Sequence, residues 1–66
     1  AHIGVAPERT VAVEDSPHGI TAATRAGMYT IALRGDGNME ADLSAADTVV
    51  TGPAALRTEL RSATTE

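Results

Sequence analysis

The chain has 66 residues, a formal net charge of −4, no cysteine and a single aromatic residue, Tyr29. This length allows at most one small domain, and the lack of cysteine excludes disulfide bonds and thiolate metal sites. Its five basic residues are all arginines scattered along the sequence, so we expect no binding of nucleic acid. No apolar run approaches the roughly 20 residues of a membrane span, so we expect a cytoplasmic protein that does not bind a membrane.

The first residues indicate that the chain starts within an element. The stretch AHIG is typical of the last turn of a helix, with Gly4 as the residue that ends it. We therefore expect residues 1–66 to be the C-terminal piece of a longer protein.

A buried strand and then a helix are predicted next. Residues 10–13 (TVAV) are β-branched or small and apolar on both faces, as in a strand inside a parallel sheet. Ser16 is a favoured N-cap residue and Pro17 suits the first helical position, so the helix runs over about residues 17–26. Gly27 is then the residue that ends the helix in the left-handed conformation.

The second half of the chain continues this alternation. The predicted elements are a buried strand over residues 29–33, a turn-rich loop over 34–38, a short helix over 39–46, a strand over 47–50, a last helix over 53–61 and a frayed tail over 62–66. Strands that alternate with helices favour a parallel sheet with right-handed crossovers. The sequence therefore predicts an α/β fold with about three strands and three helices.

Two adjacent carboxylates, Glu14 and Asp15, follow the first predicted strand and precede the helix. Ligands of open α/β sheets bind at the carboxyl ends of the strands, and a helix N-terminus favours an anion such as phosphate. Since side chains alternate along a strand, one carboxylate would face the crevice while the other braces the loop. Mg²⁺ is typically held by one or two carboxylates together with substrate phosphate, so the pattern suits a Mg²⁺ and phosphate site. Acidic residues before a helix are also ordinary capping chemistry, and spacing alone favours that interpretation.

Residues 5–33, VAPERTVAVEDSPHGITAATRAGMYTIAL, resemble the fourth motif of the haloacid dehalogenase (HAD) superfamily. They are most similar to its branch of sugar-phosphate phosphatases and β-phosphoglucomutases, in which an apolar strand leads into an acidic pair, a serine and an alanine-rich helix. The resemblance implies a Rossmann-like, three-layer core, of which this chain is the C-terminal part. It also implies Mg²⁺ as cofactor, Asp15 as its ligand, Glu14 as a direct or water-mediated partner, and Ser16 as a loop-ordering and candidate substrate-binding residue.

The other parts of the family's chemistry are expected upstream of residue 1. HAD enzymes use an aspartate nucleophile, in an Asp-x-Asp-x-Thr motif, and a lysine that holds the phosphate; the printed sequence has neither. The resemblance thus implies a fragment, inactive alone, of a Mg²⁺-dependent phosphohydrolase for small phosphorylated metabolites, with sugar phosphates favoured. Its partners would be that substrate and the missing N-terminal part of the core, and the strand over 10–13 would have an open edge.

Three alternatives remain open. A β-phosphoglucomutase-type phosphomutase would use the same motif. A receiver-like regulatory module also holds Mg²⁺ with an acidic pair, but it needs a phospho-acceptor Asp at the end of a later strand and a lysine, which this sequence lacks. A non-catalytic interaction fragment would look like an inert piece of an enzyme. His18 and Arg34 are interpreted as solvated loop residues, although Arg34 could approach a phosphate.

Overall fold

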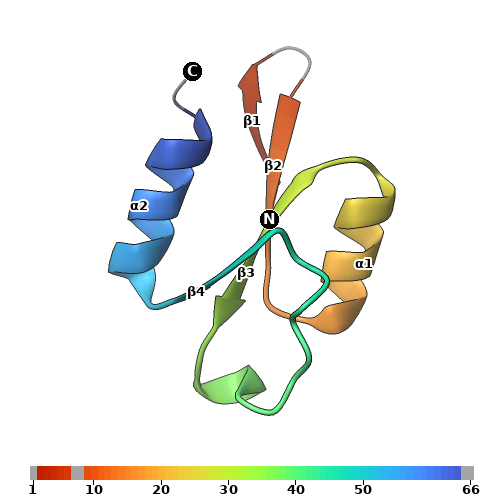
Figure 1. Cartoon of the computed structure of the whole chain (residues 1–66), viewed down its shortest axis with the longest axis vertical. Coiled ribbons are helices and arrows are strands. Elements are labelled where there is room, and N and C mark those ends of the chain that lie inside the picture. The colour runs from red at the N-terminus through yellow and green to blue at the C-terminus, as the bar shows by residue number, and fades with distance from the viewer. Residues whose placement is uncertain (1, 7–8, 65–66) are drawn as a thin grey trace.

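A computed structural model describes residues 2–6 and 9–64 of the chain. The elements, in chain order, are β1 (His2–Ala6), β2 (Arg9–Glu14), α1 (Pro17–Arg25), β3 (Tyr29–Arg34), the short 3-10 helix η1 (Asp36–Asn38), β4 (Thr48–Thr51) and α2 (Pro53–Thr64). Figure 1 shows the strands between the two α-helices, with α1 on one side and α2 on the other.

All four strands form one sheet, in the order β1-β2-β3-β4. β2, β3 and β4 run parallel, with Val11 opposite Tyr29 and Ile31 opposite Thr48. The parallel three-stranded sheet that the strand–helix alternation predicted is therefore confirmed, and so is the α/β class.

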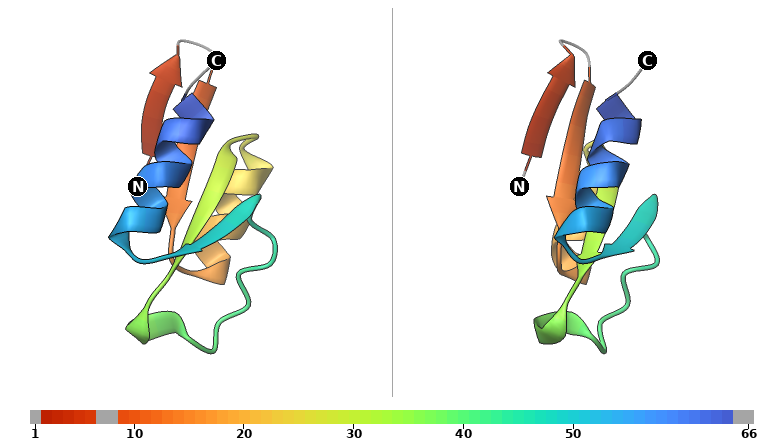
Figure 2. Two further views of the ribbon diagram at one scale, coloured as in Figure 1. Left: turned by 60° about the vertical axis from the view of Figure 1, so that its left-hand side comes forward. Right: turned by 90° about the vertical axis from the view of Figure 1, so that its left-hand side faces the viewer.

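β1 corrects two expectations from the sequence. Residues 2–6 form a strand, not the last turn of a helix, and Gly4 lies inside that strand beside a shift in register. Ile3 and Val5 are good β-formers, and the edge of β2 offers their backbone groups antiparallel hydrogen-bond partners. As Figure 2 shows, β1 lies alongside β2, so the edge of β2 that we expected to be open is paired.

One hydrophobic cluster on each face of the sheet holds the helices in place. Successive residues of a strand point to opposite faces, so Ile31 and Ala32 of β3 belong to different clusters. The cluster beneath α2 comprises the buried residues Val11, Ile31 and Val50 with the partly buried Leu33, Leu56, Leu60 and Ala63. The cluster beneath α1 comprises Ile20, Ala32 and Leu43, with Ala41 and Ala46 packed against it. The sheet is thus the middle of three layers.

The connection from β3 to β4 corrects a third expectation. Residues 39–46, predicted as a short helix, form turns and irregular backbone, so the α-helices among the described residues are α1 and α2. The carboxylate of Asp42 accepts hydrogen bonds from the backbone N–H of Ser44 at 3.0 Å and from its hydroxyl at 2.6 Å. Such local bonds compete with helical ones. They leave Leu43 to insert beneath α1, where it is fully buried.

The two helices begin as the sequence predicts. Ser16 caps α1 by accepting a hydrogen bond from the backbone N–H of Gly19 at 3.1 Å, and Gly27 ends it with a φ of +81°. α2 starts at Pro53 but continues to Thr64, so residues 62–64 belong to the helix; the rest of the predicted frayed tail lies outside the described residues. Within residues 2–6 and 9–64, neither helix is long and apolar enough to cross a membrane.

Candidate metal centre

A hollow of about 670 Å³ lies at the carboxyl ends of β2 and β3. Its wall is built from two segments that are distant in the sequence, residues 15–17 at the entry to α1 and the stretch around η1, residues 35–41, with Leu33 at the end of β3. This is the edge of a parallel sheet at which ligands of α/β proteins bind. The predicted acidic pair leads into it.

Glu14 and Asp15 point to different sides of the loop. Glu14 is the last residue of β2, and its carboxylate lies beside Gly19 in the first turn of α1, where it fills the space of a possible side chain at that position. Asp15 is exposed and lines the hollow. The Glu14 carboxylate thus lies against the helix, whereas Asp15 is exposed at the wall of the hollow.

Ser16 joins the loop to α1. Its hydroxyl oxygen accepts the hydrogen bond from the Gly19 N–H, and the residue also forms part of the wall of the hollow. The cap, one residue after Asp15, fixes where the helix starts. A helix terminus of this kind carries partial positive charge and favours anions.

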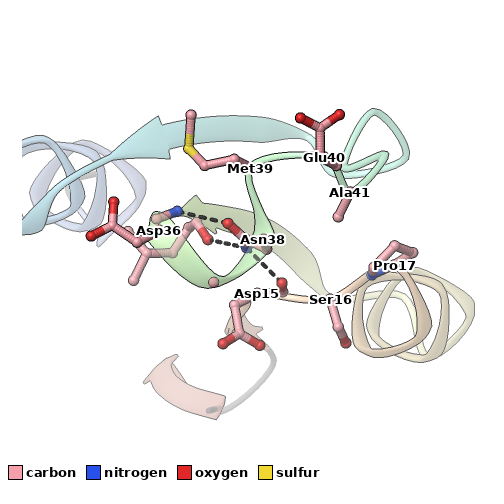
Figure 3. Close-up of a pocket in the computed structure, with 11 residues that line it drawn as sticks. Asp15, Ser16, Pro17, Asp36, Asn38, Met39, Glu40 and Ala41 are labelled. Atoms are coloured by element: carbon pink, nitrogen blue, oxygen red, sulfur yellow. Dashed lines mark hydrogen bonds between the residues drawn. The ribbon is translucent and has the colours of Figure 1, made fainter.

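The acidic side chains around the hollow do not converge on one point. In Figure 3 the side chains of Asp15 and Ser16 point away from those of Met39 and Glu40. Among the described residues, no group of three or more His, Cys, Asp or Glu side chains is placed to hold a metal ion. The oxygen ligands fit a hard cation by type, but they supply only part of the octahedral shell that Mg²⁺ requires. Of the predicted acidic pair, Asp15 is the residue that lines the hollow, and a Mg²⁺ bound there would need further oxygens from water, phosphate or other groups.

Asn38 is a residue of this site that the sequence did not reveal. Its side-chain amide donates hydrogen bonds to the backbone oxygen of Asp15 at 2.7 Å and to that of Leu33 at 2.9 Å, and its side-chain oxygen accepts from the Gly35 N–H at 2.7 Å. In the sequence, Asn38 stands among glycines and an aspartate, where asparagine is an ordinary turn residue. Only the folded arrangement shows that it joins the loops after β2 and β3.

Arg34 has a different role from the two that were considered. Its guanidinium donates hydrogen bonds to the backbone oxygens of Asn38 at 3.0 Å, Met39 at 2.9 Å and Ala41 at 3.2 Å. It is therefore not the solvated loop residue that was expected, because these donors hold the loop that follows β3, and it does not belong to the described wall of the hollow. His18 is exposed in the first turn of α1, in agreement with its interpretation as a solvated residue.

Comparison of the chain with protein-family models, with curated proteins and with solved structures finds no match.

Proposed function

We propose that this chain is the C-terminal part of the core domain of a Mg²⁺-dependent phosphohydrolase of the HAD type. The enzyme acts on small phosphorylated metabolites, with sugar phosphates favoured, through an aspartyl-phosphate intermediate formed on a residue outside this chain. The observation that carries the proposal is the position of Asp15, exposed at the carboxyl end of a parallel strand, between the hollow and the N-terminus of α1.

Each residue of the motif has a separate task in this proposal. Asp15 binds the Mg²⁺, which neutralises charge on the phosphoryl group. Glu14 holds the loop against the first turn of α1, beside Gly19. Ser16 fixes the start of the helix, and the partial positive charge of this helix terminus favours an approaching phosphate.

The isolated chain is expected to be catalytically inert, because it has one side of a metal site without a nucleophile. The purified 66-residue chain should release no phosphate from sugar phosphates in the presence of Mg²⁺. Release that depends on Mg²⁺ and is abolished by Asp15→Asn would contradict this expectation.

The coding sequence upstream of the Ala1 codon provides a direct test of the family assignment. We expect an open reading frame that runs back through a lysine to a strand ending in Asp-x-Asp-x-Thr. A stop codon in frame a short distance upstream would contradict the proposal. The next experiment would then be a search for a partner protein instead of a substrate.

The full-length protein allows a test of the role of Asp15. Asp15→Asn should lower Mg²⁺-dependent phosphate release by about 100-fold or more, since a metal ion contributes several kcal/mol and each 1.4 kcal/mol is tenfold in rate. Asp42→Asn is the matched control, because Asp42 is an exposed carboxylate outside the hollow. Equal activity of the two variants would exclude Asp15 as the ligand.

Inorganic phosphate as product distinguishes a hydrolase from a phosphomutase, which returns the phosphoryl group to the sugar.

A further inference from the structure

The wall of the hollow is joined across its two segments by one side chain. We propose that Asn38 is a positioning residue for Asp15: its amide fixes the carboxyl end of β2 to the loop that follows β3, and so determines where the Asp15 carboxylate lies. The link between Asn38 and Asp15 stands on hydrogen bonds alone, whereas its effect on a bound cation rests on the proposed function.

The amide of Asn38 is well matched to its three partners. One hydrogen of the amide nitrogen points to the Asp15 oxygen (Figure 3). The other points to the Leu33 oxygen, and the side-chain oxygen accepts from the Gly35 N–H. Of the short side chains, only an amide combines two donors with an acceptor. The partners also settle the orientation of the amide, because backbone oxygens only accept and a backbone N–H only donates.

The bonds of Asn38 continue the contact between β2 and β3 beyond the end of their ladder. The last paired residues of the two strands are Glu14 and Ala32. The backbone oxygens of the residues that follow them, Asp15 and Leu33, both accept a hydrogen bond from the Asn38 amide. Without that amide, the backbone oxygen of Asp15 loses the hydrogen bond that joins it to the loop after β3, and the part-buried Leu33 oxygen loses a hydrogen-bond donor.

The main chain of Asn38 is itself held in place. Its backbone oxygen accepts hydrogen bonds from the Arg34 guanidinium at 3.0 Å and from the Ala41 N–H at 3.0 Å. The amide therefore projects from a loop that is fixed on both sides of it. A firmly held outer partner is what orients a metal ligand, and loss of such a partner typically weakens metal binding by about 10–100-fold.

Two variants at position 38 separate the bonds that carry this inference. Asn38→Ala removes all three. Asn38→Asp keeps an oxygen that can accept from the Gly35 N–H but removes the two donors, so it tests the link to Asp15 with little change in side-chain size. It replaces Asn38→Ala in the experiment if that variant does not fold. Asp47→Ala is the matched control, since it removes the hydrogen bond that the Asp47 carboxylate accepts from the Thr30 N–H (2.7 Å) at the opposite end of the sheet.

The first measurement is the ¹⁵N relaxation of backbone amides in the full 66-residue chain. Asp15 and Ser16 should have order parameters near those of rigid backbone, about 0.85, and both Asn38 variants should lower them toward the flexible range, below about 0.6. Asp47→Ala should leave them unchanged. Order parameters at Asp15 and Ser16 that stay the same in both Asn38 variants would overturn the proposal.

The second measurement is a MgCl₂ titration followed by the ¹³C shift of the Asp15 carboxyl group. The native chain should respond, and Asn38→Ala should bind about tenfold more weakly, the lower end of the effect of lost outer partners. A native response with equal affinity in Asn38→Ala would overturn the positioning role. No response in the native chain would count against the proposed function, and the order parameters would then decide the Asn38 inference alone.

Discussion

The carboxylate of Glu14 fills the space in which a side chain at position 19 would lie, so Glu14 and Gly19 fit together because Gly19 has no Cβ. The backbone of Gly19 is helical and does not itself require glycine; the glycines with positive φ are Gly27 and Gly52 among the residues described. Glycine lowers helix stability relative to alanine by roughly 0.5–1 kcal/mol. Glycine at position 19 thus lowers the stability of α1 but leaves room for the Glu14 carboxylate beside the candidate metal centre.

A double-mutant cycle at these two positions measures that relationship. In the native chain, Gly19→Ala should change the free energy of unfolding by less than about 0.5 kcal/mol, because the gain in helix propensity is offset as the end of the Glu14 side chain is displaced. In a Glu14→Ala background the same substitution should stabilise the chain by about 0.5–1 kcal/mol. Urea unfolding of the four chains gives the coupling energy. An identical effect of Gly19→Ala in the two backgrounds would show that the residues do not interact.

Leu43 should be the most sensitive position of the connection between β3 and β4. It is 1% exposed and packs with Ile20 of α1, and truncation of a buried leucine to alanine costs about 2–5 kcal/mol. Since domains have roughly 0.05–0.15 kcal/mol of stability per residue, Leu43→Ala should remove much of the stability of so short a chain. Val49→Ala is the control, because Val49 is 43% exposed. Equal thermal midpoints for the two variants would refute the anchoring role of Leu43.

Local signals in the sequence were sufficient for the parts of the fold that local chemistry determines. Ser16, Pro17 and Gly27 mark the ends of α1 as predicted, since caps depend on neighbouring residues. The strands over β2, β3 and β4 were also identified, because short runs rich in β-branched and apolar residues between turn residues are typical of buried strands. The position of Asp15 at the edge of the sheet follows from the same elements.

Features that depend on distant residues could not be predicted in this way. Residues 39–46 have a helix-compatible composition, but the burial of Leu43 beneath α1 and the turn at Asp42 determine their path. β1 forms where the edge of β2 provides a partner. Asn38 and Arg34 stand in a stretch that reads as a turn, and their roles come from contacts that only the folded chain makes.

The Tyr29 hydroxyl should contribute to the attachment of α2. It donates a hydrogen bond to the Glu59 carboxylate at 3.0 Å, so it accepts the bond that it shares with the Thr48 hydroxyl at 2.8 Å. Tyr29→Phe should lower the free energy of unfolding by about 1 kcal/mol, the usual net value of such bonds. Glu59→Gln, which keeps an acceptor, should lower it less. Native stability in Tyr29→Phe would show that these exposed bonds contribute nothing.

The carboxyl group of Asp42 provides a test by pH. Hydrogen bonds from the Ser44 hydroxyl, and then from the Ser44 backbone N–H, lower the pKa of Asp42 below its ordinary value. Because these bonds are lost on unfolding, their contribution to stability is present above the ordinary carboxyl pKa of about 3.9 and disappears as the pH falls through the lower folded pKa. Ser44→Ala should raise the pKa of Asp42 in an NMR titration, whereas Ser44→Thr should preserve it. An unchanged pKa in Ser44→Ala would contradict the assigned cause.

The inward direction of Arg34 has a consequence for any ligand. Its charge is directed at the backbone oxygens of the loop, while the ionisable residues in the described wall of the hollow are Asp15, Asp36 and Glu40. An anion that enters alone meets carboxylates of its own sign. On the proposed function, a divalent cation should therefore bind at this edge of the sheet before phosphate does, and a chelator should weaken the binding of phosphate although it changes nothing in the protein itself.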